Sequence, residues 1–506
     1  MKKRILALLF AGIMVMGLLA ACGGGDSTPS SSGGTSGGET AASGDFNDVT
    51  IRFQVIGWGG PGDAEMQRLS TAVTEHLGNL GRPYKVDIIF QEGGDYTDRT
   101  NLMLASGGNE FDIIFIANWA ANFFANAAAG YLTPLEPYLA NYPEIERILT
   151  ADFMNASNVG GVNYSLPTNK EKARSMGWVF REDIVDALGM DLGAIQALPY
   201  EQRKDAIEPY FYRAKEEHGL WIWPWIPTDY QFDRILEPVI SSRVEPGATN
   251  AIVAEFEPNF MDGVKEASKW FADGLINPDL TNQSTGDEEF ATGRYFAITY
   301  QLKPGKDKEL EGAITGDFKF VQLVMNQPEI ANTETTGAML AIPHGAPNKN
   351  EAFDFISLLY TDTIMINTMI WGTEGHDWQF VGDGIIDFID GGWSYGHGWT
   401  MGDQFKNYLT AAEDPNKWNE FIAFNESGRP LPLLGFVADP SSIEMQTWFS
   451  AMQAVRELYG DLFRGYYPVD QVDAEFARLK SEYEVAGMNE LLEAVQAQID
   501  EWLAAQ

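Results

Sequence analysis

Cysteine is almost absent from this chain of 506 residues, which contains only Cys22. A single thiol cannot form an intramolecular disulfide, and a zinc site built from several cysteines is excluded as well. Histidine is also scarce: there are five, and no two are separated by four residues, the spacing of a helical zinc motif. We therefore expect no metal ion, no cofactor and no catalytic cysteine.

Basic residues are few, with 34 Lys and Arg against 72 Asp and Glu, so the net charge is −38. Proteins that bind nucleic acid use Lys and Arg to neutralise phosphates, and binding to anionic lipid headgroups relies on the same residues. The composition therefore argues against a nucleic-acid partner and against adhesion to an anionic membrane surface.

One long uncharged run is present, from Ile5 to Ala21, directly after Lys2, Lys3 and Arg4. As a helix this run would span about 25 Å, which is short of the ~30 Å hydrocarbon core of a bilayer. A basic start, an apolar middle and small residues at the end are typical of a secretory signal peptide. We assign residues 1–21 to such a signal and regard a permanent transmembrane helix as the weaker alternative.

The signal ends in Leu19-Ala20-Ala21-Cys22, which resembles a bacterial lipobox, where cleavage occurs before a cysteine that becomes diacylglycerol-modified. The resemblance implies that Cys22 is a lipid attachment site. An ordinary signal peptide with a cysteine near its end is the alternative. Residues 22–45 are rich in Gly, Ser and Thr, a composition that cannot bury enough apolar area to fold, so we expect a flexible tether.

Strand and helix patterns alternate after residue 45. Residues 49–55 alternate apolar and polar side chains, residues 63–77 show helical spacing, and the same order repeats with strands at 84–90 and 111–116. This order predicts an α/β lobe with a largely parallel sheet. The last 70 residues return to long helices, and one of them has apolar residues at 3–4 spacing: Leu492, Val495, Ile499 and Trp502.

A Gly57-x-Gly59-x-x-Gly62 pattern follows the first strand and opens a helix, as in dinucleotide-binding folds. Glu92, however, lies 30 residues beyond Gly62 rather than about 20, and Pro61 lacks the N–H that would bind pyrophosphate. Nicotinamide cofactors are also scarce outside the cell. A glycine-rich turn that lets Trp58 reach a cleft is the better interpretation.

Tryptophans are the most informative residues. Trp58 and Trp119 both follow predicted strands, at the carboxyl ends where open α/β sheets bind ligands. Aromatic faces stack on the weakly apolar C–H surfaces of sugars, while amide and carboxylate groups bind the hydroxyls. A glycine-rich region contains four more tryptophans: Trp371, Trp378, Trp393 and Trp399.

Several short stretches resemble the extracellular solute-binding lipoproteins of carbohydrate ABC importers. They are 111–119 (FDIIFIANW), 129–135 (AGYLTPL), 162–167 (VNYSLP), 178–183 (WVFRED), 273–279 (DGLINPD) and 337–342 with 348–360. The C-terminal stretches 371–375 (WGTEG), 435–441 (GFVADPS), 486–490 (AGMNE) and 498–503 (QIDEWL) resemble the subgroup that carries a dedicated C-terminal domain.

The resemblance implies an α/β fold of two lobes, of the type II periplasmic-binding-protein kind, joined by a hinge of several crossings and ending in helices. The first lobe would comprise residues 46–163 and about 335–430, and the second 164–334 and about 431–506. The protein would be a monomer anchored on the extracytoplasmic face of the membrane. It would close on a carbohydrate, most simply an oligosaccharide, and deliver it to the transmembrane subunits of an ABC permease.

Candidate ligand-binding residues divide into two groups. Stacking candidates are Trp58, Trp119 and Trp371, with Tyr300 as an aromatic candidate in the second lobe, and candidates for binding hydroxyls are Asn118, Asn169, Glu171 and Glu374. Two alternatives stay open. The solute could be a peptide or another polar molecule, including an anionic sugar bound by Lys170, Lys172 and Arg174. The protein could also be an exported polysaccharide-degrading enzyme, although incidental carboxylate pairs are unavoidable among 72 acidic residues.

The lipobox generates the first testable prediction. Cys22→Ala removes the only thiol that could carry lipid, so the variant should leave the membrane fraction but still bind its solute. Fractionation of cells followed by detection of the protein measures this. Retention of the variant in the membrane fraction would show that the anchor is not at Cys22.

Overall fold

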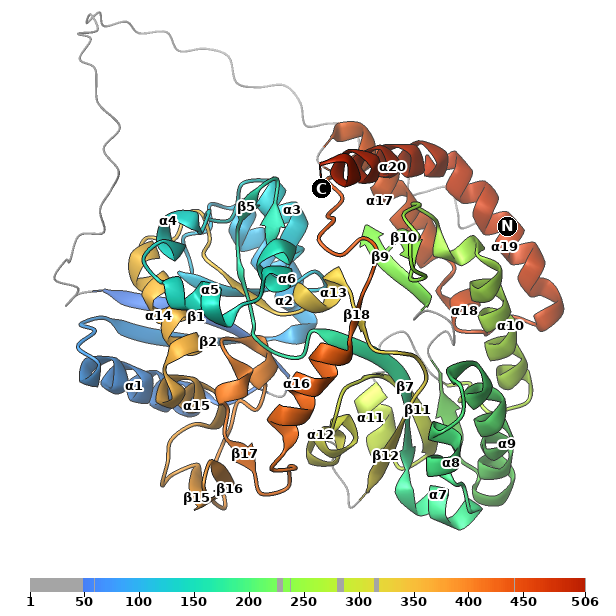
Figure 1. Cartoon of the computed structure of the whole chain (residues 1–506), viewed down its shortest axis with the longest axis horizontal. Coiled ribbons are helices and arrows are strands. Elements are labelled where there is room, and N and C mark those ends of the chain that lie inside the picture. The colour runs from blue at the N-terminus through green and yellow to red at the C-terminus, as the bar shows by residue number, and fades with distance from the viewer. Residues whose placement is uncertain are drawn as a thin grey trace, which may run out of the picture. The chain divides into compact units, whose positions relative to one another are not determined.

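The computed structural model describes residues 49–505, apart from 59, 225–230, 237, 280–285, 314–317 and 441. A first sheet has the strand order β2-β1-β3-β14-β6 (Figure 1). Its strands are β1 (Thr50–Gly57), β2 (Lys85–Glu92), β3 (Ile113–Ile116), β14 (Met339–Ala341) and β6 (Leu166–Pro167). The expected strands at 49–55, 84–90 and 111–116 are thus confirmed, with small shifts at their ends.

Strands β1, β2 and β3 are parallel, whereas β14 runs antiparallel to β3 and to β6. The carboxyl ends of β1 and β3 therefore meet at one edge of the sheet. Side chains alternate between two cores: Phe53 and Val55 face helices α1, α14 and α15, whereas Ile56 faces α2 and α3. These helices are α1 (Asp63–Asn79), α14 (Lys349–Thr361), α15 (Thr363–Trp371), α2 (Gly93–Ala105) and α3 (Phe123–Ala128).

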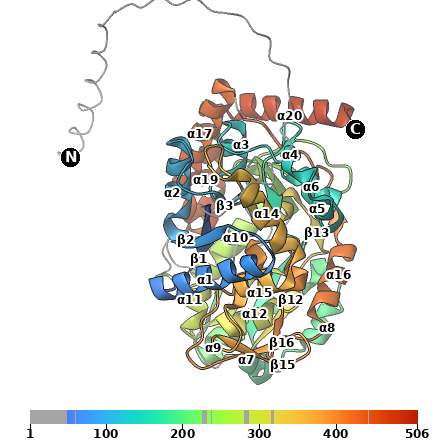
Figure 2. The same ribbon diagram turned by 90° about the vertical axis from the view of Figure 1, so that its left-hand side faces the viewer.

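The edge strand β2 is covered by α1, which lies along it in both views (Figure 1 and Figure 2). Two outward N–H groups of β2 donate to hydroxyls of that helix: Val86 to Thr74 Oγ1 at 3.1 Å and Ile88 to Ser70 Oγ at 2.9 Å. Exposed strand edges invite pairing with other chains, and this cover removes two free donors from the edge.

A second sheet has the order β18-β13-β7-β11-β8, with β12 also paired to β7. The long central strand β7 pairs antiparallel with β11 and β12, and its first two residues pair with β13. The bounds are β7 (Ala173–Arg181), β8 (Trp221–Trp223), β11 (Tyr295–Leu302), β12 (Phe320–Val324), β13 (Glu329–Ile330) and β18 (Arg429–Pro430). The helices of this part are α7 (Glu182–Leu188), α8 (Leu192–Gln196), α9 (Tyr200–His218), α11 (Gly286–Ala291) and α12 (Lys306–Ala313).

The chain passes between the two sheets three times. It leaves the first sheet at β6 and enters β7, returns from β13 to β14 through α13 (Asn332–Thr335), and leaves again through α16 (Lys417–Ser427) to β18. Before α16 it forms a three-stranded sheet of β15 (Trp378–Gly382), β16 (Ile385–Phe388) and β17 (Leu409–Thr410). The short elements between β3 and β6 are α4 (Glu136–Leu139), α5 (Pro143–Ile148), α6 (Ala151–Ala156), β4 (Asn158–Val159) and β5 (Val162–Asn163).

The C-terminal helices share a separate core with α10 (Pro258–Ala272) and the hairpin of β9 (Phe232–Leu236) and β10 (Ile240–Arg243). They are α17 (Ile443–Glu457), α18 (Gly460–Phe463), α19 (Val469–Val485) and α20 (Met488–Ala504). The apolar face expected for the last helix is confirmed, since Val495 and Ile499 are buried and Leu492 and Trp502 pack against this core. Among the residues that the structure describes, no helix combines the length and apolarity needed to cross a membrane.

A buried carboxylate ties this C-terminal core together. Glu255 is fully buried, with Oε1 2.9 Å from Arg456 Nε of α17 and 3.5 Å from Arg234 Nη1 of β9. Because the core joins residues about 200 positions apart in the chain, this ion pair helps to fix which helix packs on the hairpin.

We predict that Glu255→Gln lowers the free energy of unfolding by about 3–5 kcal/mol, because it leaves two guanidinium groups without a charged partner. Glu217→Gln is the matched control. It removes an exposed pair with Arg213 four residues away and should cost about 0.3–0.5 kcal/mol. Chemical denaturation of both variants compares them, and equal losses would show that the buried pair has no special role.

Candidate functional site

Three tryptophans form an aromatic platform at the carboxyl edge of the first sheet: Trp58, Trp119 and Trp399. The ring centroid of Trp58 is 6.3 Å from that of Trp119 and 6.3 Å from that of Trp399, with interplanar angles of 23° and 26°. The Trp119 and Trp399 centroids are 6.2 Å apart. Trp58 follows β1 and Trp119 follows β3, so the parallel pairing of these strands brings the two rings together.

The platform is exposed although its members are large and apolar. Trp58 is 48% exposed and Trp119 is 45% exposed. Both rings are nevertheless positioned. Trp119 donates from Nε1 to the carbonyl of Gly337 at 2.8 Å, and a Cβ atom on Gly93 would lie 2.5 Å from Nε1 of Trp58. Exposed apolar rings held in fixed positions are typical of a binding surface.

Neutral groups support the platform from behind. The Phe115 ring lies 5.8 Å from Trp119 and 6.1 Å from Trp399, and the His397 ring meets Trp58 edge-on at 5.5 Å. Burial lowers the pKa of His397, which keeps its imidazole neutral at physiological pH. The immediate support of the platform is therefore apolar or uncharged, which suits stacking with a neutral ring.

Two of the predicted polar candidates lie close to the platform along the chain. Asn118 precedes Trp119, and its backbone N–H donates to Thr336 O at 3.1 Å, whereas its side-chain Oδ1 is buried without a hydrogen-bond partner in the described structure. Asn169 donates from Nδ2 to Asp403 Oδ1 at 2.8 Å, and its N–H donates to Gly402 O. Asn169 thus holds the loop that follows Trp399.

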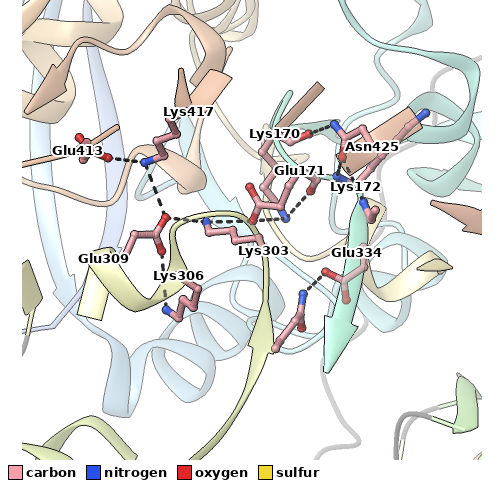
Figure 3. A network of polar contacts seen from close by, with 12 residues as sticks. Lys170, Glu171, Lys172, Lys303, Lys306, Glu309, Glu334, Glu413, Lys417 and Asn425 are labelled. Atoms are coloured by element: carbon pink, nitrogen blue, oxygen red, sulfur yellow. Dashed lines mark hydrogen bonds and ion pairs between the residues drawn. The ribbon is translucent and has the colours of Figure 1, made fainter. Parts of the chain in front are cut away.

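Glu171 lies in a network of charges at the first crossing (Figure 3). Its Oε1 is 3.2 Å from Lys303 Nζ at the end of β11, and Lys303 is also 3.0 Å from Glu309 of α12. Glu309 is in turn 3.8 Å from Lys417 of α16, which pairs with Glu413. The network therefore connects the first crossing, the second sheet and the third crossing.

Burial acts to raise the pKa of Glu171, but the ammonium groups of Lys170 and Lys303 outweigh it and lower this pKa to about 2. For Lys303 burial acts to lower the pKa, and the carboxylates of Glu171 and Glu309 raise it well above its ordinary value. All these groups stay charged at neutral pH, so each buried charge depends on its partners.

The remaining predicted candidates have other neighbours. Tyr300 lies on β11 with Lys306 Nζ 5.4 Å from its ring centroid. Trp371 packs against the core around α1 and α15, 5.9 Å from the Phe388 ring. Glu374 is exposed in the turn before β15, where it bridges to Trp378. The structure thus brings Trp58 and Trp119 together and gives Trp371 and Glu374 contacts outside the platform.

Sequence reasoning missed two important residues. Trp399 was one of four tryptophans in a glycine-rich region, but nothing in the spacing distinguishes it from the others. Lys303 carries no sequence signal, because its partner Glu171 is 132 residues away. Both depend on contacts that only the folded chain creates.

Comparison with known proteins places the fold among transport receptors. Residues 81–366 match the family model described as bacterial extracellular solute-binding protein, and residues 432–504 match a domain of unknown function (DUF3502). A carbohydrate ABC transporter substrate-binding protein of Streptococcus pneumoniae serotype 4 is 24% identical over 443 residues, which cover 83% of this chain and 84% of that protein.

Solved structures agree on the fold. The N-glycan transport solute-binding protein NgtS of S. pneumoniae has a TM-score of 0.75 at 21% identity, covering 90% of this chain and 99% of that one. Its complex with Man5GlcNAc has a TM-score of 0.71 at 20% identity with the same coverage. The alginate-binding protein AlgQ2 without calcium ion has a TM-score of 0.56 at 15% identity, covering 89% and 98%.

The charge network predicts a specific pH dependence for Glu171→Gln. Because the folded-state pKa of Glu171 is about 2 against an ordinary value of 4.5, its ionised form stabilises the fold above about pH 5. This contribution is lost as the pH falls towards 2. The variant should therefore be less stable than the wild type at pH 7, and the difference should shrink on acidification.

Denaturation curves from pH 7 down to pH 3 measure this difference. Glu374→Gln, at an exposed carboxylate, is the control and should change the free energy of unfolding little at any pH. A deficit of Glu171→Gln that stays constant over this pH range would contradict the electrostatic role of Glu171.

Proposed function

Because the chain belongs to the bacterial extracellular solute-binding protein family, we propose that it captures a carbohydrate and delivers it to an ABC permease. The observation that carries this proposal is the exposed platform of Trp58, Trp119 and Trp399. Aromatic faces of this kind stack on sugar rings, and three centroids about 6 Å apart offer more area than one ring needs. We therefore propose an oligosaccharide. The sugar-binding relatives support the same ligand class.

The charges near the crossings favour a neutral sugar over an anionic one. Lys170 pairs with Glu171 at 3.5 Å, and Arg174 lies 3.9 Å from Asp233. Cations that already face carboxylates attract a uronate less than free cations would. A peptide or another polar solute remains the alternative ligand for the same receptor role.

The proposed mechanism is closure of two lobes around the sugar. The first lobe would comprise residues 46–167 and about 335–430, and the second residues 168–334 and about 431–506. The first limit is placed after Pro167, rather than after residue 163, because β6 pairs within the first sheet. Closure requires a ligand that binds the closed form better than the open form, so contacts from both lobes are needed.

We further propose that Cys22 carries a lipid that holds this receptor on the extracytoplasmic face, as a monomer, close to the permease. Cys22 and the tether of residues 22–45 lie outside the described residues. The proposal rests on the Leu19-Ala20-Ala21-Cys22 sequence. A tether of this kind raises the local concentration of the receptor at its permease.

We predict that Trp58→Ala and Trp119→Ala each weaken oligosaccharide binding at least tenfold, about 1.4 kcal/mol, because each removes a stacking face. A thermal-shift screen over neutral glycans, uronates and peptides identifies the ligand first, since binding to the folded state raises its melting temperature. Calorimetry then measures the affinity of each variant.

Trp221→Ala is the control. Trp221 is a half-buried tryptophan on the edge strand β8 of the second sheet, and its loss should leave the affinity within about twofold. A shift with peptides and none with any sugar would overturn the ligand class. Release of shorter glycans during incubation would instead identify an exported polysaccharide-degrading enzyme and overturn the receptor proposal.

A further inference from the structure

The one-turn helix α13, on the second crossing, contacts a different part of the protein through each of its first three residues. Asn332 binds the start of the C-terminal domain, Thr333 binds the first crossing, and Glu334 binds β11. The residues directly after the helix hold Asn118 and Trp119. α13 therefore connects the C-terminal domain to the tryptophan platform.

Asn332 is 6% exposed, and its side chain is saturated by three hydrogen bonds to the segment 433–436. Nδ2 donates to Leu433 O at 3.1 Å and to Phe436 O at 2.6 Å, and Oδ1 accepts from Gly435 N at 2.8 Å. This segment leads into the domain that matched a family of unknown function. Buried amides with complete hydrogen bonding fix one geometry, because any shift leaves a polar group unpaired.

The same residue is rigidly joined to the platform side of the helix. The carbonyl of Asn332 accepts from Thr336 N at 2.9 Å, from Thr336 Oγ1 at 2.8 Å and from Thr335 Oγ1 at 3.0 Å. Thr336 O then accepts from Asn118 N at 3.1 Å, and Gly337 O accepts from Trp119 Nε1 at 2.8 Å. A displacement of Asn332 would thus displace both acceptors.

The other two contacts hold the helix from the opposite side. Thr333 Oγ1 accepts from Arg174 Nη1 at 3.1 Å, and the Glu334 carboxylate accepts from Nε2 of Gln301. Figure 3 shows Glu334 beside the strand end that carries Lys303. α13 is therefore held by the two other bodies that a hinge would have to move.

We propose that Asn332 is a positioning residue for the tryptophan platform and that the C-terminal domain acts as the brace that fixes it. The domain would have no contact with the solute. It would set the place of α13, and through Thr336 and Gly337 the place of Trp119. The inference rests on the proposed function only for its consequence on sugar affinity, because the coupling itself is a property of the ligand-free protein.

Hydrogen exchange with mass spectrometry on the ligand-free, full-length protein tests the coupling. Asn332→Asp keeps the shape but places a carboxylate against the carbonyls of Leu433 and Phe436. We expect about tenfold faster exchange in peptides covering 433–436, 333–337 and 117–119. Faster exchange at 433–436 alone would overturn the proposal, because the domain would then be anchored without being coupled.

Asn367→Asp is the matched control. Asn367 is 1% exposed and has the same pattern, since Nδ2 donates to Thr363 O and Lys406 O and Oδ1 accepts from Tyr408 N. This variant should speed exchange around 406–408 and leave 333–337 unchanged. Equal effects of both variants at 333–337 would reveal general destabilisation and overturn the specific role of Asn332.

Thr336→Val tests the same path if Asn332→Asp does not fold. It removes one hydroxyl hydrogen bond to Asn332 O and leaves the contacts with 433–436 intact. Exchange at the Asn118 amide should rise while 433–436 stays protected; an unchanged Asn118 amide would overturn the proposed path. Calorimetry with the sugar identified above should show weaker binding by the same variants. A wild type that binds no sugar would refute the proposed function and leave the exchange result standing.

Discussion

A buried positive charge needs a negative partner, and Lys303 meets this need with residues from separate parts of the chain. Its ammonium group lies between Glu171 of the first crossing and Glu309 of α12, and Glu309 also faces Lys417 of α16. Removing any member would leave an uncompensated charge, at a cost of several kcal/mol. Electrostatics therefore keep the end of β11 against two of the three crossings, and the position of the second sheet depends on this constraint.

Hydrogen bonds add the third crossing to the same assembly. Asn425 of α16 accepts from Lys172 N at 2.7 Å and donates to Lys170 O at 3.2 Å. Arg174 of β7 reaches Thr333 of α13. The crossings are thus joined to one another as well as to the sheets. A hinge of this kind transmits movement as a unit, which suits a receptor whose two lobes must close together on one ligand.

Sequence alone predicted the part of the site that local order determines. Trp58 and Trp119 each follow a strand, and parallel strands bring their carboxyl ends to one edge, so their proximity follows from the pattern. Trp399 joins them through a loop whose path has no periodic signal. α13 is a single turn in which Asn332 bonds residues 101 to 104 positions later. Such long-range polar contacts leave no trace in local composition.

The exposed platform and the saturated crossings have opposite requirements, and the structure separates them in space. Rings that stack on a ligand must stay open to solvent, so Trp58 and Trp119 cannot be fixed by burial. Their positions must instead come from the backbone behind them. Trp119 obtains this through Gly337, which follows α13, and α13 is fixed by buried polar bonds at Asn332. Order in the covered hinge thereby replaces the packing that the open binding face lacks.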